Sequence, residues 1–252
     1  MMTKINQLIS QWPAGSLMTA VYLQKRGISP ALRRRYVDSN WLESVGRGAY
    51  KRPGDSVDWL GGVHTLQTQL KMTVHPGGKT ALALKGSSHF VPLGPAGVFL
   101  FGKRGDRLPK WFTEYHWPET VLYKPTALFE GDLSKYMTDH KHKELGIRIA
   151  SRELAFLEML YHLPARQGFM EAFSIMENLA TLRPKVVQKL LELCRSVKVK
   201  RLFLFLAQRA DHPWFKKLNT ADLDLGKGKR MIIKHGVLDK TYAITVPKEL
   251  TG

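Results

Sequence analysis

Three consecutive arginines, Arg33, Arg34 and Arg35, lie in a segment whose spacing is typical of a short helix. Leu32 and Tyr36, four residues apart, mark the side of this helix that we expect to be buried. At about 100° per residue, Arg34 points almost directly away from that side, and Arg33 and Arg35 flank it. Guanidinium groups form paired hydrogen bonds with phosphate oxygens and with the major-groove edge of guanine. The three arginines therefore predict a helix that binds DNA.

The start of this helix and the helix before it carry capping signals. The Ser29 hydroxyl can accept a hydrogen bond from a free N–H group of the first turn, and Pro30 suits the first helical position. Thr19 is the matching cap for a helix expected over residues 20–26, and Gly27 suits the left-handed residue that ends it. Two short helices joined by a glycine turn are typical of a helix-turn-helix motif.

A Gly46-Arg47-Gly48 turn follows the basic helix, between two short runs in which apolar residues alternate. This pattern predicts a β-hairpin with Arg47 at its tip. A hairpin directly after a helix-turn-helix indicates the wing of a winged helix.

The predicted DNA contacts differ in role. Arg34 is expected to contact a base, and Arg33 and Arg35 to divide between bases and phosphates. Arg47 would enter the minor groove or hold a phosphate. The full predicted set is Lys25, Ser29, Arg33, Arg34, Arg35, Arg47, Lys51 and Arg52, with Lys25 and Ser29 on the DNA backbone and Lys51 and Arg52 at the base of the hairpin.

A turn-rich break from Pro53 to Ser56 predicts a domain boundary. We expect an α+β protein with a winged helix-turn-helix domain over residues 1–54 and a larger mixed α/β domain over residues 55–252. In the first domain a further helix is expected near residues 5–12. In the second, strands are expected at residues 89–93, 98–101, 120–123, 126–129, 231–233 and 242–246, and helices at 152–162, 169–182, 184–196 and 200–210.

The charge balance favours a polyanionic partner. Thirty-nine Lys and Arg residues against 21 Asp and Glu give a net charge of +18, and no acidic residue lies between Asp58 and Asp106. A second basic patch is therefore a candidate for nucleic-acid contact, for contact with an acidic partner, or for simple solvation. Its residues are Lys79, Arg201, Lys227, Lys229 and Arg230.

The sequence Gly77-Gly78-Lys79-Thr80 resembles the end of a phosphate-binding loop, but Thr73 stands where that motif needs its first glycine. We expect a strand-to-helix turn instead, with exposed N–H groups and Lys79 forming a weak anion site.

No catalytic or metal site is expected. The only cysteine, Cys194, lies on an apolar helical stripe and is predicted to be a buried thiol. His140 and His142 lie in a charged stretch that reads as a solvated loop rather than a ligand pair. No cofactor is implied, and without a signal peptide or membrane span we expect a soluble, cytoplasmic protein.

Eight short motifs, spread over most of the chain, carry a family resemblance. They are Thr19-Ala20, Gly27-Ile28-Ser29, Leu32-Arg33-Arg34, Val45-Gly46-Arg47-Gly48-Ala49-Tyr50, Gly77-Gly78-Lys79-Thr80-Ala81-Leu82-Ala83-Leu84, Ala150-Ser151-Arg152-Glu153-Leu154-Ala155, Val199-Lys200-Arg201-Leu202-Phe203-Leu204 and Tyr242-Ala243-Ile244-Thr245-Val246-Pro247. With these motifs the sequence resembles the AbiE-type abortive-infection antitoxins, the antitoxin half of type IV toxin–antitoxin systems. The resemblance implies a winged-helix repressor that binds its own promoter. It also implies a co-encoded nucleotidyltransferase-like toxin, which the protein neutralises through its second domain without the need for a stable complex.

Two other classes stay open. A winged-helix nucleic-acid-binding protein without a toxin partner would share every feature of the first domain. An enzyme that processes nucleic acid would need a carboxylate cluster for metal or a nucleophile with a base, and the sequence shows neither.

Overall fold

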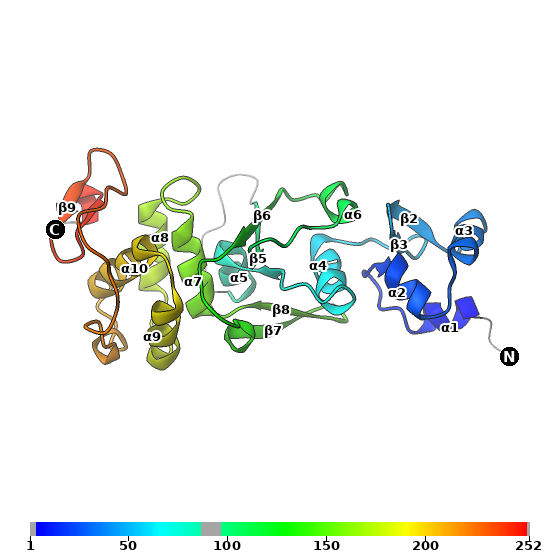
Figure 1. Cartoon of the computed structure of the whole chain (residues 1–252), viewed down its shortest axis with the longest axis horizontal. Coiled ribbons are helices and arrows are strands. Elements are labelled where there is room, and N and C mark those ends of the chain that lie inside the picture. Colours follow the sequence, from blue (N-terminus) through cyan, green and yellow to red (C-terminus); the bar gives the residue numbers. More distant parts are fainter. Residues whose placement is uncertain (1–3, 87–96, 251–252) are drawn as a thin grey trace. The chain divides into compact units, whose positions relative to one another are not determined.

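The computed structural model describes residues 4–86 and 97–250 (Figure 1). It is a mixed α and β protein whose internal contacts divide it into two compact units, each assembled from several segments of the chain. The first unit comprises Met1–His75, Gly94–Pro125 and Asp139–Arg148, and the second comprises Pro76–Leu93, Thr126–Thr138 and Ile149–Gly252.

The first unit begins with three helices and three short strands. In chain order these are α1 (Lys4–Ser10), β1 (Met18–Thr19), α2 (Ala20–Lys25), α3 (Pro30–Asp38), β2 (Glu43–Gly46) and β3 (Ala49–Lys51). The strands form an antiparallel sheet of order β1-β3-β2. The predicted helices and the β2–β3 hairpin are confirmed, whereas β1, only two residues long, was not predicted.

The capping predictions are confirmed at atomic level. Thr19 Oγ1 accepts a hydrogen bond from the Tyr22 N–H at 3.2 Å, and Ser29 Oγ accepts one from the Leu32 N–H at 3.2 Å. Gly27 has a φ of 77°, the left-handed conformation that glycine adopts without strain. Local signals thus determine where α2 and α3 begin and how sharply the chain turns between them.

A small hydrophobic core holds these elements together. The buried members of this core are Ile5, Leu8, Trp12, Met18, Leu23, Ile28 and Leu42. Removal of these apolar side chains from water is the main force that holds α3 against α1, α2 and the sheet.

The remainder of the first unit contains α4 (Trp59–Thr68) and α6 (Lys110–Thr113), with β5 (Val98–Lys103) and β6 (Val121–Thr126) in a sheet of order β4-β5-β6. The short strand β4 (His75–Pro76) lies where the two units meet in sequence. Helix α4 is bound to β1, because Gln69 accepts from the Thr19 N–H at 2.8 Å and donates to the Leu17 carbonyl at 2.7 Å. The predicted boundary between residues 54 and 55 stays a prediction.

The β7–β8 hairpin was not predicted. Strands β7 (Met137–His142) and β8 (Leu145–Ala150) pair with each other, so the expected solvated loop at His140 and His142 is wrong. The polar sequence of β7 shows no apolar alternation, which hid the strand. His142 is half-buried, and its Nε2 lies 2.7 Å from Oδ2 of Asp58, the residue that caps α4.

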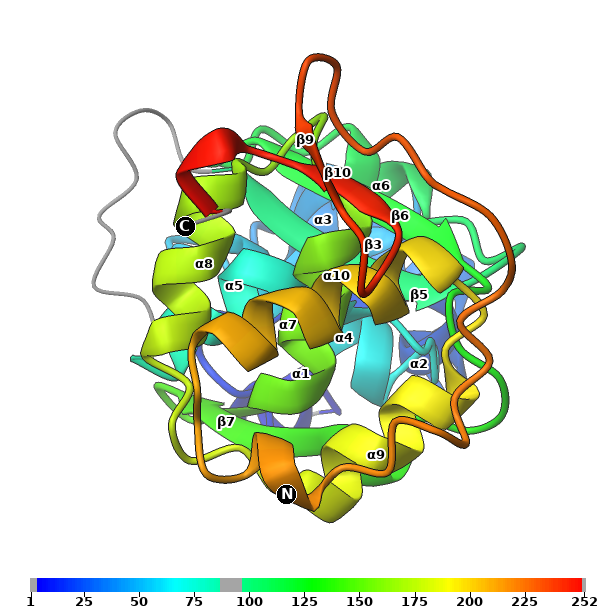
Figure 2. The ribbon, with the colours of Figure 1, turned by 90° about the vertical axis from the view of Figure 1, so that its left-hand side faces the viewer.

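The second unit is mainly helical. It contains α5 (Gly78–Leu84), α7 (Arg152–Tyr161), α8 (Phe169–Glu177), α9 (Pro184–Leu193) and α10 (Val197–Arg209), followed by the antiparallel pair β9 (Val237–Asp239) and β10 (Ile244–Val246). Helix α7 packs against α5, α9 and α10, and α10 also packs on α8 (Figure 2). The four helices predicted between residues 152 and 210 are confirmed, but α8 ends at Glu177 instead of residue 182, and α10 begins at Val197 instead of residue 200.

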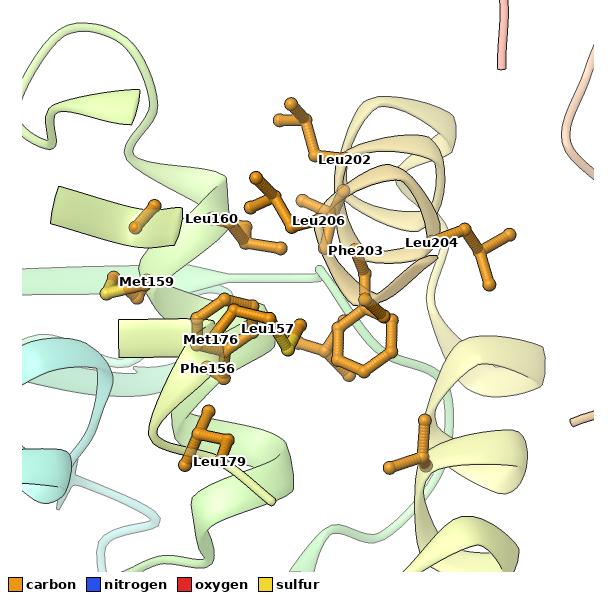
Figure 3. Packing of buried hydrophobic residues seen from close by; sticks show 14 of the residues in the cluster. Phe156, Leu157, Met159, Leu160, Met176, Leu179, Leu202, Phe203, Leu204 and Leu206 are labelled. Carbon is orange, nitrogen blue, oxygen red and sulfur yellow. The ribbon is translucent and has the colours of Figure 1, made fainter. Parts of the chain in front are cut away.

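The core of this unit lies between α7, α8 and α10. Phe156 of α7 and Phe203 of α10 meet in an edge-to-face arrangement with ring centroids 5.9 Å apart, a geometry that aromatic rings favour (Figure 3). Met176 of α8 lies beside them (Figure 3). This apolar centre explains why the helical periodicity in this half of the sequence is easy to read.

Three segments of the second domain that were predicted to be strands are not described as strands over their predicted length. Of residues 126–129, Thr126 ends β6 and Phe129 forms an isolated bridge with Cys194, while the Leu128 N–H donates to the Thr126 hydroxyl. Residues 231–233 are not a strand, because the N–H groups of Ile232 and Ile233 both donate to the Thr245 hydroxyl. The strand expected at residues 89–93 lies outside the described residues.

An ion pair between the buried Glu153 of α7 and the largely exposed Arg183, which precedes α9, makes the stability of the second unit depend on pH. Burial alone would raise the pKa of Glu153, but hydrogen bonds from Arg183, at 2.8 Å and 3.1 Å, hold that pKa at about 2. The folded-state pKa is therefore below the unfolded one. The pair stabilises the fold fully above about pH 4.5, and this contribution is lost as the pH falls toward 2.

We expect Glu153→Gln to lower the free energy of unfolding by about 2–3 kcal/mol at pH 7, because the neutral amide loses the charge-assisted bonds. Urea denaturation at pH 7, 4 and 3 measures this difference, which should shrink with each step. A difference that is the same at all three pH values would show that Glu153 acts through its shape and not its charge.

Candidate nucleic-acid interface

Helix α3 exposes two of its three arginines. The side chains of Arg34 and Arg35 are exposed, and no described residue forms an ion pair with either. The inner side of the helix is formed by Leu32, Tyr36 and Val37, which pack on the first core. Two free guanidinium groups on the outer side of an anchored helix suit contact with phosphates or base edges.

Arg33 differs from its two neighbours and from the sequence prediction. It is only 8% exposed, and its Nη1 donates to the carbonyl oxygens of Ile28 at 3.0 Å and Ala20 at 3.3 Å. The prediction oriented the helix by Leu32 and Tyr36 alone, whereas Val37 also faces inward and turns Arg33 toward the core. The guanidinium thus joins α3 to the first turn of α2, and it is not available to DNA in this structure.

Arg33→Ala is therefore expected to lower the free energy of unfolding of the first unit by about 2–3 kcal/mol, because two carbonyl oxygens lose their donor. The matched control is Arg35→Ala on the same helix, which should change stability by less than about 0.5 kcal/mol. Thermal denaturation followed by circular dichroism compares the two. Should Arg33→Ala be as stable as Arg35→Ala and still lose operator DNA, Arg33 would be a DNA contact after all.

The two predicted backbone contacts lie where α2 meets α3. Lys25, in the last turn of α2, is exposed, and so is Ser29, the residue that caps α3. The Ser29 hydroxyl already accepts from the Leu32 N–H, but it keeps its own O–H for donation. Both side chains are therefore free to reach a phosphate beside the exposed face of α3.

The hairpin carries one free charge and two paired charges. Arg47 is exposed at the tip of the β2–β3 turn. Lys51 forms an ion pair with Glu43 at 3.0 Å across the hairpin, and Arg52 forms one with Asp55 at 2.9 Å. Lys51 and Arg52 therefore brace the base of the hairpin, while Arg47 is left free to meet a ligand.

Two family models match the chain. One is described as a transcriptional regulator, AbiEi antitoxin of a type IV toxin–antitoxin system, and matches residues 96–247. The other, for the AbiEi antitoxin N-terminal domain, matches residues 1–93. The chain belongs to the AbiEi antitoxin family. This confirms the resemblance drawn from the short motifs.

One solved structure with a similar fold is the crystal structure of the Rv2827c protein from Mycobacterium tuberculosis. It superimposes with a TM-score of 0.59 and 15% sequence identity, over 95% of this AbiEi-family chain and 88% of that chain. At this identity the likeness concerns the fold alone. No curated protein matches the chain.

The weak anion site predicted at the start of α5 is already occupied by the AbiEi chain's own carboxylates. The Gly78 N–H donates to Oε2 of Glu158 at 3.1 Å, and Lys79 forms an ion pair with Glu171. The strand-to-helix turn itself is confirmed, since β4 leads directly into α5. Lys79 therefore serves the internal structure of the second unit.

Arg201 also departs from the prediction of a basic surface. It is only 3% exposed, and its guanidinium donates to the carbonyl oxygens of Leu225, Gly226, Gly228 and Ala243 at 2.7 to 3.1 Å. Burial, and then the charge of Arg230, lower the pKa of Arg201. The sequence gives no sign of this role, because the four acceptors are backbone atoms distant in sequence, three in the loop at residues 225–228 and one in the turn before β10.

The other members of the second basic patch are on the surface. Lys227, Lys229 and Arg230 are exposed in the loop whose carbonyl oxygens Arg201 holds. Arg201, which the prediction grouped with them, is buried, and Lys79 is partly buried in its ion pair with Glu171.

The remaining predicted features concern reactivity. Cys194 is buried, as predicted, and burial raises the pKa of its thiol to about 11, which makes it a poor nucleophile. Within residues 4–86 and 97–250, no three His, Cys, Asp or Glu side chains are grouped as a metal site would require.

No helix in the described ranges is long and apolar enough to cross a membrane.

Proposed function

We propose that this AbiEi-family regulator is a winged-helix repressor that binds its own promoter and neutralises a co-encoded nucleotidyltransferase-like toxin. The observation that carries the DNA-binding part is the pair of exposed, unpaired arginines on α3, beside a hairpin with Arg47 at its tip. The toxin partner follows from the family, whose members are antitoxins of type IV systems.

The winged-helix assignment is supported by element order and strand register. The chain runs α1-β1-α2-α3-β2-β3, and β3 lies between β1 and β2, with Thr19 opposite Ala49 and Ser44 opposite Tyr50. This arrangement supports our assignment of α2 and α3 as the helix-turn-helix, of α3 as the recognition helix and of β2–β3 as the wing.

Each proposed contact has a role that its placement supports. Arg34 and Arg35 read base edges and hold phosphates in the major groove, and Arg47 reaches the minor groove or a phosphate beside it. Lys25 and Ser29 hold the DNA backbone at the turn between α2 and α3. Lys51 and Arg52 keep the wing in shape, and Arg33 keeps α3 in place.

Repression of the promoter and neutralisation of the toxin are two activities, and a variant of α3 should affect only the first. In cells, the wild-type protein should repress a reporter fused to its own upstream DNA and rescue growth when the neighbouring toxin is expressed. The double variant Arg34→Ala/Arg35→Ala should lose repression and keep rescue, because the family resemblance assigns neutralisation to the predicted second domain, residues 55–252, which contains neither arginine.

The matched control for charge is Lys216→Ala/Lys217→Ala, which removes two exposed positive charges from the second unit. It should repress as the wild type does.

A wild-type protein that fails to repress would refute the repressor assignment, and one that represses without rescuing any cell would refute the antitoxin assignment. Loss of rescue in the α3 variant would make neutralisation dependent on DNA binding.

A further inference from the structure

The loop between β5 and α6, together with the two residues that border it, carries four cations that no predicted site includes. Lys103, Arg104, Arg107 and Lys110 are all exposed, and no described carboxylate pairs with any of them. We call these four residues the loop cations.

The loop cations are held on a fixed backbone. The one carboxylate among them, Asp106, accepts a hydrogen bond from the Thr73 hydroxyl at 2.9 Å. The same hydroxyl accepts from the Lys103 N–H at 3.1 Å, and the Asp106 N–H closes the turn onto the Lys103 carbonyl. The Asp106 carboxylate forms no ion pair with any of the four loop cations in the described structure, so each of them keeps its charge for an outside anion. The hydrogen-bonded backbone of the loop reduces the entropy lost when they bind that anion.

The wing lies directly against α6. A side chain on Gly46 would come within 3.3 Å of Cα and Cβ of Trp111, and β2 and α6 are in contact within the first unit. Gly46 also has a φ of 140°, which few other residues tolerate. Arg47 directly follows Gly46, and Lys110 directly precedes Trp111. The unpaired arginine of the wing and one of the loop cations are therefore each one residue away from the contact between Gly46 and Trp111.

Duplex DNA presents a negative charge about every 1.7 Å along its axis. A duplex held by α3 and Arg47 therefore continues past the wing with phosphates at every step. The next acidic residue after Asp106, Glu114, caps the C-terminal end of α6 one turn from Lys110, and no ion pair joins these two side chains in the described structure.

We propose that the loop cations bind the phosphodiester backbone of DNA on the far side of the wing, so that the operator contact extends beyond the helix-turn-helix and its hairpin. This inference rests on the proposed DNA-binding function. It assigns the loop a contact of affinity, not of sequence, because phosphates carry no base information.

The test uses the full-length protein with Arg107→Ala/Lys110→Ala, fluorescence anisotropy, and both operator and random duplexes over a series of salt concentrations. Each lost phosphate contact should reduce the slope of log K against log[salt] by about 0.9, so the double variant should lose about 2. Affinity at about 0.15 M salt should fall roughly tenfold or more, by a similar factor on both duplexes. Circular dichroism confirms that each variant is folded.

Two reference variants separate the possible outcomes. Lys216→Ala/Lys217→Ala removes the same charge elsewhere and should leave the slope unchanged; an equal fall there would reduce the effect to net charge and overturn the loop site. If Arg34→Ala/Arg35→Ala loses the operator while the loop variant keeps the wild-type slope, the loop inference is wrong and the proposed function stands. If the wild type binds neither duplex, the proposed function fails and the loop inference fails with it.

Discussion

Replacing Arg34 and Arg35 together by alanine is expected to weaken operator binding by about 2–6 kcal/mol, which is at least thirtyfold. Both guanidinium groups are exposed and unpaired in the described structure, so their removal costs the free protein no internal bond. Thermal stability should therefore stay close to that of the wild type. Random DNA should lose much less affinity, because contacts with base edges contribute only at the correct sequence.

Anisotropy titrations on an operator duplex and a scrambled duplex of the same length measure this prediction. Lys216→Ala/Lys217→Ala again controls for the loss of two charges. Equal losses on the operator and the scrambled duplex would show that Arg34 and Arg35 only hold phosphates. The reading of bases would then have to come from another element, and the orientation assigned to α3 would be wrong.

Arg201→Ala is expected to lower the free energy of unfolding of the second unit by about 3 kcal/mol or more. The four carbonyl oxygens that receive its hydrogen bonds would lose their donor together, and each buried acceptor left unpaired costs about 1–3 kcal/mol. Arg201→Lys should recover only part of this, because an ammonium group cannot reproduce the planar fork of a guanidinium.

Urea denaturation of both variants, with Lys229→Ala as the exposed control from the adjacent loop, tests the role of Arg201. The control should unfold as the wild type does. Should Arg201→Ala be as stable as the control and bind nucleic acid more weakly, the residue would belong to a binding surface, as the sequence suggested.

Sequence was a good guide where the signal is local. Thr19, Ser29 and Gly27 act on N–H groups or backbone angles within three residues of themselves, and each behaves as its type and position indicate. The hairpin around Arg47 follows from its two glycines. None of these features depends on a distant part of the chain.

The structure places a predicted site residue differently from the sequence expectation where its partner is distant in sequence. Lys79 forms an ion pair with Glu171, and Arg201 donates hydrogen bonds to backbone carbonyl oxygens more than twenty residues later, such as that of Leu225. From the sequence alone, both side chains were therefore predicted to be surface charges. Arg33 is buried because tertiary packing turns α3 slightly beyond the face that Leu32 and Tyr36 define. Arg52 is the exception, since its partner Asp55 lies three residues away and an i, i+3 pair of opposite charges was visible in the sequence.

The loop cations escaped the sequence prediction for a related reason. Their charges are scattered over eight positions with an aspartate among them, a pattern usual for a solvated turn. Only the structure shows that Asp106 is engaged by Thr73 and that the adjacent helix supports the wing.

We propose that α3 binds a specific sequence in the DNA upstream of the protein's own gene. Hydroxyl-radical footprinting of that DNA with the full-length protein tests this claim most directly. We predict a discrete protected site that disappears with Arg34→Ala/Arg35→Ala and persists with Lys216→Ala/Lys217→Ala. Protection spread evenly along the fragment, or the same protected site with the α3 variant, would contradict the claim.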